Sequence, residues 1–368
     1  MGTRIGGFIG FSTAASSNAA RGIWNPDSQA YFMRQGEAFW PVGESFGPVQ
    51  ATGGTIVTPG NGYKYHYFTS SGTFNVIAGA GPGVLYMVGG GGGGAGGQGG
   101  GGGAGGMRTV PVSLGTGLVT VTIGAGAAND SPTGPITGSS EPTGGRGLVG
   151  SATTLSSTTV ANPLNGIYAS GGGGGVQAAS PSVYALGGSG GGDSAYRVVE
   201  NNPNTSPGPG LVSNDGNLGG FTPPEGNRGG WTDAGSISPN YGGSGGGGAG
   251  GVGANGNPST GGAGGVGAAF ADPTIPSDYG TPGPDGALRY FAAGGGGATY
   301  TSGTTPNQYG GGGKGGARAT IGSTHQPYQD GTANTGSGGG GLGDNVGGEP
   351  TCGSGRGGSG FLCIRYPV

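Results

Sequence analysis

The residues that most often carry out chemistry are few in this chain and lie far apart in the sequence. There are two histidines, His66 and His325, and two cysteines, Cys352 and Cys363. A zinc site needs about four such ligands, and a nucleophilic triad needs a histidine beside a nucleophile and an acid. Neither arrangement can be argued here, and the 16 acidic residues are scattered through the loops. The sequence therefore predicts no enzyme, no metal site and no cofactor.

The sequence also does not match the glycine motifs that bind phosphate or calcium. Lys314 follows a glycine run, but Gly315 stands where a phosphate-binding loop requires Ser or Thr. Asp193 and Asp344 lie beside glycine runs at offsets that do not fit the calcium-binding nonapeptide. These glycines are therefore better interpreted as structural.

The histidine and the cysteines also fit structural roles. His66 lies in the alternating segment 63–68 (YKYHYF), where a sheet-face residue is a better interpretation than a ligand. Cys363 lies in the apolar segment 361–366 and fits a small packed side chain. A disulfide between Cys352 and Cys363 is left open as an alternative.

The composition excludes several classes of protein. The chain has 105 glycines and 26 prolines in 368 residues, but its glycines come in unbroken runs, whereas collagen needs one at every third position. Only 8% of residues are charged and the net charge is −3, so a surface for nucleic acid is not expected. No apolar run approaches the about 20 residues that span a membrane, and the N-terminus lacks a signal-peptide pattern. We therefore expect synthesis in a cytoplasm.

The longest glycine run, residues 89–106, is interrupted only by Ala95, Gln98 and Ala104. Such a run can form a left-handed helix of three residues per turn, whose peptide groups point sideways and need partners on neighbouring helices. At about 3.1 Å per residue, it predicts one rod of roughly 55 Å. Shorter runs occur at 171–175, 187–192, 242–251, 261–267, 294–297, 310–316, 336–343 and 353–360. We therefore expect a laterally packed bundle of polyglycine II helices.

Strand patterns surround the first runs. Residues 63–68 place Tyr63, Tyr65 and Tyr67 on one face, opposite a face with Lys64, His66 and Phe68. Residues 84–88 (VLYMV) are apolar on both faces and predict a central strand, and 107–123 predicts a hairpin with one buried face. The segment 361–366 has no partner nearby and is expected to return to the early sheet.

The predicted fold class is all-β plus polyglycine II, without substantial α content. It is a small antiparallel β-sandwich whose strands run into a bundle of glycine-rich left-handed helices. We divide the chain into an N-terminal segment (1–50), the sandwich with the first glycine helices (51–175), the bundle with aromatic loops (176–356), and a C-terminal strand that returns to the sandwich (357–368).

Two sets of aromatic residues are candidates for binding. Residues 1–50 are rich in bulky side chains without a core of their own, which favours burial against a partner over packing on the rest of the chain. The later loops carry aromatic rings among Ser, Asn and Gly, a mixture typical of binding surfaces; the alternative is that the rings plug the ends of the bundle. The recognition candidates are Tyr196, Trp231, Tyr279, Tyr290, Phe291 and Tyr328.

Two groups of segments resemble phage virion proteins, especially those of viruses that infect marine cyanobacteria. GGFIG (6–10), Gly22-Ile23-Trp24 and Arg34…Trp40-Pro41 are similar to a leader on cyanophage tail and fibre proteins. The other group is similar to a glycine-rich domain of phage fibres and adhesins: FTSSGTFNV (68–76), VLYMVGGGGGGAGG (84–97), IYASGGGGG (167–175) and GGSGFLCIRYPV (357–368).

The resemblance implies a virion appendage that is assembled in the host cytoplasm. The leader would contact tail or adaptor proteins through Phe8, Ile9, Ile23, Trp24, Arg34 and Trp40. The loops would bind a host-surface glycan or outer-membrane protein, and such fibres are usually homotrimers. The alternative is a structural tail, neck or capsid-decorating spacer; a secreted matrix protein is disfavoured by the missing signal pattern. Nucleic acid is not an expected partner, and the chain is not expected to be an integral membrane protein.

Overall fold

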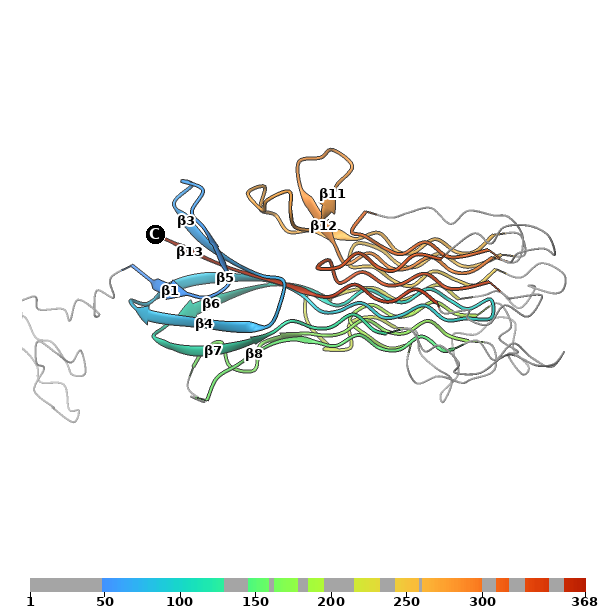
Figure 1. The fold of residues 1–368 in the computed structure, drawn as a ribbon, viewed down its shortest axis with the longest axis horizontal. Helices are drawn as coiled ribbons and strands as arrows, with labels where there is room; N and C mark the ends of the chain where they lie inside the picture. Colours follow the sequence, from blue (N-terminus) through green and yellow to red (C-terminus); the bar gives the residue numbers. More distant parts are fainter. Residues whose placement is uncertain are drawn as a thin grey trace, which may run out of the picture.

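The computed structural model describes residues 48–128, 145–158, 162–177, 185–194, 215–231, 242–257, 260–299, 309–317, 328–343 and 354–368. Figure 1 shows a β-sandwich at one end and a bundle of extended segments that runs away from it. Outside the described residues lie the predictions for Tyr196 and for the N-terminal residues Phe8, Ile9, Ile23, Trp24, Arg34 and Trp40.

The regular elements of the described residues are all β-strands, which confirms the predicted all-β class. The first sheet contains, in order, β1 (Gln50–Thr52), β4 (Gly72–Ala78), β7 (Gly117–Thr122), β8 (Thr153–Ser156) and β9 (Tyr168–Ala169). The second contains β2 (Thr55–Val57), β3 (Tyr63–Phe68), β13 (Phe361–Pro367), β5 (Gly81–Val88) and β6 (Met107–Leu114). A small third sheet contains β10 (Ala268–Ala269), β12 (Arg289–Phe291) and β11 (Thr281–Pro282).

The chain passes from one sheet to the other at a glycine corner. Gly53 and Gly54 join β1 to β2 and have φ angles of 111° and 64°, which lie in the region that favours glycine. A Cβ atom on Gly53 would lie 1.9 Å from the carbonyl oxygen of Thr73. This corner therefore requires glycine for both its conformation and its packing.

The alternation of β3 separates two apolar clusters. Phe68 joins the core between the two sheets, which includes Phe74, Leu85, Val121 and Ile364. Tyr65 and Tyr67 point to the outer face of the second sheet, where a second cluster contains Tyr86, Phe270, Phe291 and Phe361. The predicted division of 63–68 into two faces is thus confirmed.

The C-terminal strand completes the second sheet. β13 lies between β3 and β5 and pairs antiparallel with both, as its apolar sequence and lack of a nearby partner predict. β5 is likewise interior, between β13 and β6. Cys363 of β13 is a free, fully buried thiol and forms no bridge in the structure, while Cys352, its alternative partner, lies outside the described residues.

The predicted hairpin over 107–123 is also wrong. β6 pairs with β5 in the second sheet, whereas β7 pairs with β4 and β8 in the first. Val119 and Val121 of β7 are buried in the core between the sheets, and Val110 and Val112 of β6 pack against it. The period-two pattern was correct, but both strands bury their apolar side chains in one core from opposite sheets.

The long glycine run folds back on itself. The amides of Gly89, Gly92 and Ala95 donate to the carbonyls of Gly106, Gly103 and Gly100, at 2.9, 2.8 and 2.9 Å. Gly97 and Gln98 have φ angles of 62° and 58° and form the turn between the two antiparallel segments. The prediction of one continuous rod of roughly 55 Å is therefore wrong, because the turn divides the run into two antiparallel segments, 89–95 and 99–106.

The other amides of the first segment, 89–95, bond to different neighbours in turn. Gly90 and Gly93 donate to Ser151 and Leu148, at 2.9 Å each. Gly91 and Gly94 donate to Gly358 and Gly355, also at 2.9 Å. Successive amides therefore reach three neighbouring segments, and every third amide returns to the same one.

The returning segment, 99–106, lies at the centre of the bundle. Its amides donate in turn to three neighbours, at residues 170–176, 244–247 and 336–339. Its carbonyls accept from three others, at residues 89–95, 189–192 and 295–298. A Cβ atom on Gly102 would lie 2.2 Å from the carbonyl oxygen of Gly92, so the segments approach at a distance that only glycine permits.

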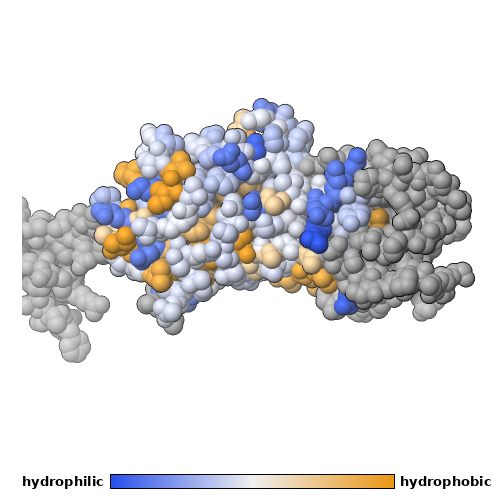
Figure 2. All heavy atoms as spheres, viewed as in Figure 1, coloured by the Kyte–Doolittle hydropathy of each residue, from blue (hydrophilic) through white to orange (hydrophobic). Residues whose placement is uncertain are grey.

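The surface reflects the same division. In Figure 2 the described atoms along the bundle are mostly pale, and the strongly hydrophobic residues of this face gather mainly over the sandwich. The bundle is thus built from residues that have almost no side chain to expose or to bury.

Candidate functional site

The structure divides the recognition candidates between two places. Trp231 and Tyr328 lie at the end of the bundle marked by Gln98, which we call the tip. Tyr279, Tyr290 and Phe291 lie in residues 268–292, which we call the cover segment, beside the sandwich. The sequence could not show this separation, because both groups occupy glycine- and proline-rich stretches of similar composition.

Trp231 is held at the tip by two contacts. The guanidinium of Arg228 lies 4.2 Å from the centre of the Trp231 ring. The backbone amide of Trp231 donates to Oδ1 of Asn255 at 3.1 Å. The ring is partly exposed, as is that of Tyr328, whose neighbour Gln329 is bonded to Lys314 and Gly340. Both rings are placed where a ligand at the tip could reach them.

The rings of the cover segment have a different role. Phe291 is fully buried and stacks on Phe361 at 4.9 Å, so its prediction as an exposed recognition residue is wrong. Tyr279 stacks on Tyr67 at 4.6 Å and is partly buried. Tyr290 is partly exposed, with its ring 5.9 Å from that of Tyr309. Tyr279 and Phe291 are thus packed against rings of the second sheet, whereas the alternative to recognition placed such rings at the ends of the bundle.

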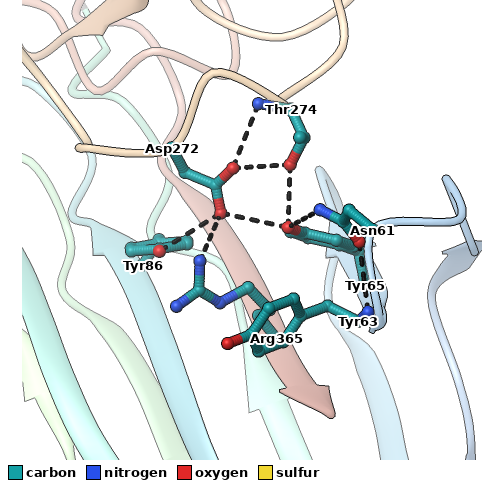
Figure 3. Close-up of polar contacts among 7 residues, drawn as sticks. All are labelled: Asn61, Tyr63, Tyr65, Tyr86, Asp272, Thr274 and Arg365. Atoms are coloured by element: carbon teal, nitrogen blue, oxygen red, sulfur yellow. Dashed lines mark hydrogen bonds and ion pairs between the residues drawn. The ribbon is translucent and has the colours of Figure 1, made fainter. Parts of the chain in front are cut away.

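The cover segment is fastened to the second sheet by a polar cluster (Figure 3). Nη1 of Arg365, on β13, lies 2.9 Å from Oδ2 of Asp272. The hydroxyls of Tyr65 and Tyr86 each donate to the same oxygen at 3.2 Å. The backbone amide of Thr274 donates to the other carboxylate oxygen at 3.0 Å. One carboxylate from the cover segment thus joins three strands of the sheet.

The electrostatics of this cluster keep Asp272 ionised. Burial by itself would raise the pKa of Asp272, but the hydrogen bonds from Thr274 and the charge of Arg365 outweigh it and hold the pKa below its usual value. Burial and the nearby carboxylate raise the pKa of Tyr86. Because Arg365, Tyr65, Tyr86 and Thr274 all donate to it, the carboxylate is already satisfied, and the cluster fits a structural fastening better than acid–base chemistry.

Sequence reasoning missed Asp272 and Arg365. The available signal was Arg365 itself, which is the single charged residue in the apolar strand Phe361–Pro367 and lies on the face of β13 shared with Cys363. A charge on a buried sheet face needs a partner, but nothing in the sequence selects Asp272 among the 16 acidic residues.

His66 is placed between the two sheets. Its Nδ1 lies 2.7 Å from the carbonyl oxygen of Gly53, and its Nε2 lies 2.9 Å from the hydroxyl of Tyr366. Burial is the main cause that lowers the pKa of His66, so the ring is neutral at pH 7. Both ring nitrogens are engaged within the core, which agrees with the interpretation of His66 as a sheet residue.

The described part of the chain lacks two further features, a metal-binding cluster and a membrane-spanning helix. Within it, no three His, Cys, Asp or Glu side chains lie close enough together to hold a metal ion. The same residues contain no helix of the length and apolar character needed to cross a membrane.

Comparison with known proteins gives one assignment. No curated protein matches the chain. The profile of a family described as a glycine-rich domain matches residues 69–367, which include the strands β4 to β13 and the whole described bundle. Because this match spans most of the sequence, the chain belongs to that glycine-rich domain family.

Proposed function

We propose that the glycine segments are polyglycine II helices and that their bundle is a stiff shaft. The support is the three-residue period of the hydrogen bonds, in which Gly89, Gly92 and Ala95 share one neighbour while the amides between them bond to two others. A helix with three residues per turn places every third peptide group on the same side. A shaft linked in this way resists bending because each segment is bonded to several others.

We propose that this shaft belongs to a phage virion appendage of the tail-fibre or adhesin type. Its tip would bind a component of the host surface, a glycan or an outer-membrane protein. The observation that carries the proposal is that the hydrogen-bonded segments return the chain repeatedly to one end of the bundle, where the partly exposed rings of Trp231 and Tyr328 lie. Variable loops on a rigid scaffold are a common design of recognition surfaces.

The opposite end of the molecule would face the particle. Residues 1–50 would bind tail or adaptor proteins, and their last residues lead directly into β1 of the sandwich. The assembled form would be a homotrimer, following the resemblance to phage fibres. In the mature virion the protein would be extracellular.

A purely structural spacer in the tail, neck or capsid decoration is the second candidate function. The burial of Phe291 and the stacking of Tyr279 on Tyr67 favour it, because these rings stabilise the body of the protein. In that case, the tip would contact other virion proteins and would have no host ligand.

Binding to cells separates the two candidates. The probe is a panel of marine cyanobacterial strains, incubated with the fluorescently labelled full chain and with a variant carrying Trp231→Ala and Tyr328→Ala. Saturable binding that the variant loses supports the adhesin. The control is Tyr309→Ala, which removes an aromatic ring that is 47% exposed near the sandwich end of the bundle. Absence of binding by the folded, assembled wild type across the panel supports the spacer.

A further inference from the structure

A cleft of about 260 Å³ lies where the sandwich meets the bundle. The start of β6 forms one wall, the loop 221–225 forms another, and Ala249 and Ala268 close the side towards the bundle. Junctions between structural units are favoured places for small-ligand sites. The volume is below the roughly 300–1,000 Å³ of pockets for drug-sized molecules, so the ligand must be small.

Arg108 is fixed at the edge of this cleft. Its guanidinium carbon lies 3.5 Å from the centre of the Phe221 ring, and its Nη1 donates to the carbonyl oxygen of Tyr168. The Phe221 ring is itself confined, since Tyr168 packs edge-on at 5.3 Å and a Cβ atom on Gly219 would lie 2.0 Å from it. A planar guanidinium held in this way presents its remaining N–H groups at fixed positions.

The charge of the cleft is balanced. Of the residues that line it, only Arg108 and Glu225 are ionisable. The carboxylate of Glu225 is buried, and its two oxygens accept hydrogen bonds from the amides of Ser170 and Gly219, at 3.0 Å each. A cleft with one charge of each sign has no net attraction for an ion, which favours a neutral ligand.

The remaining walls combine apolar surface with hydroxyl groups. Met107, Phe221, Pro223 and Pro224 are apolar, and Thr109 and Thr222 each carry a hydroxyl that can donate or accept. A sugar ring has the matching chemistry, with C–H groups on its faces and hydroxyls at its rim. We propose that this cleft binds one neutral sugar residue of a glycan.

The inference rests on the proposed function only for the source of the sugar, a host-surface glycan. The site lies at the junction, whereas the proposed recognition rings Trp231 and Tyr328 lie at the tip. Binding of a free glycoside can therefore be measured without cells.

Saturation-transfer NMR titrations of the full chain test the site. The probes are the methyl α-glycosides of glucose, galactose and mannose, with glucuronic acid as the charged counterpart. We expect saturable binding of at least one neutral glycoside. Arg108→Gln should weaken it about tenfold, and Thr109→Val, which removes one hydroxyl at nearly constant volume, about threefold. The control is Thr120→Val, an exposed threonine of β7 in the other sheet, which should bind as the wild type does.

Three results would overturn the proposal: no neutral glycoside binds, only glucuronic acid binds, or both cleft variants bind as the wild type does. Thr109→Val keeps the test decisive if Arg108→Gln fails to fold, because Thr109 is exposed. If the protein binds cells but no glycoside, only the proposed sugar site is contradicted. If the protein binds a glycoside but no cells, only the proposed adhesin function is contradicted.

Discussion

Leu85 in the sandwich and Gly92 in the bundle are both buried, but different atoms surround them. Leu85 belongs to a core of apolar side chains between two sheets. The nearest atoms to a Cβ on Gly92 would all be backbone atoms of Gly172 and Gly173. The sandwich is therefore stabilised mainly by burial of apolar surface, and the bundle by hydrogen bonds between backbones at close approach. In the sandwich, one apolar side chain can be replaced by another of similar volume. In the bundle, there is no room for any side chain at such a position.

Alanine substitutions at two adjacent glycines test this account of the bundle most directly. A Cβ on Gly92 would lie 2.0 Å from the carbonyl oxygen of Gly173, whereas on Gly93 its nearest atom is 3.2 Å away, the carbonyl oxygen of Ala128. We expect Gly92→Ala to lower the free energy of unfolding by more than about 3 kcal/mol, because backbone must move. Gly93→Ala should cost less than about 1 kcal/mol. Urea unfolding measures both, and equal effects would contradict the close-packed bundle.

The corresponding change in the sandwich removes a side chain. Leu85→Ala should lower the free energy of unfolding by about 3 kcal/mol, because a buried leucine leaves a cavity. Leu118→Ala is the matched control, since Leu118 is 54% exposed on the outer face of β7, and we expect a change within about 0.5 kcal/mol. Urea unfolding again provides the measurement. A similar loss from both variants would show that burial between the sheets is not what stabilises the sandwich.

The two regions also differ in what their sequence predicts. Side-chain alternation in 63–68 correctly assigned Tyr65 and Phe68 to opposite faces of β3. The same alternation over β6 and β7 could not say whether the strands pair with each other. A hairpin and a pair in facing sheets bury the same residues, and the choice depends on partners far along the chain.

Within the bundle, the spacing of glycines in a segment depends on how many other segments surround it. The unbroken glycines of 99–103 lie at the centre, surrounded on all sides. At the periphery only every third residue needs to be glycine: Gly253 and Gly256 are buried, while Val252 and Ala254 are exposed. Glycine carries no side-chain pattern, so the sequence could not place the turn at Gln98 or the order of the segments. Phe291 was misplaced for a related reason, because composition alone does not distinguish a packed ring from an exposed one.

The cover segment provides a case between the two regions, since a polar cluster fastens it to the sandwich. Asp272→Asn should lower the free energy of unfolding by about 2 kcal/mol, because Arg365 loses its charged partner. This is less than for a fully buried pair, since the Arg365 side chain is 22% exposed. Asp285→Asn, within the same segment, keeps the acceptor for the amide of Ala287 and should have little effect. Urea unfolding and limited proteolysis report the result, and equal behaviour of the two variants would exclude Asp272 as the fastening.

The smallest expected effect is a pH dependence confined to the sandwich. The folded-state pKa of His66 is lowered by burial, so the unfolded chain binds a proton more readily than the folded one. The stabilisation is therefore complete above the unfolded pKa of about 6.5 and is lost progressively as the pH falls below it, with a slope of at most about 1.4 kcal/mol per pH unit. His66→Gln should remove this slope between pH 6.5 and 5, and His325→Gln should retain it.

The segments 89–95 and 99–106 carry no ionisable side chain, so hydrogen-exchange protection factors of their amides in the native state should stay constant over the same range. If those protection factors fell together with the stability of the sandwich, the sandwich and the bundle would unfold as one unit. The two regions would then not be independent in stability, although different interactions stabilise them.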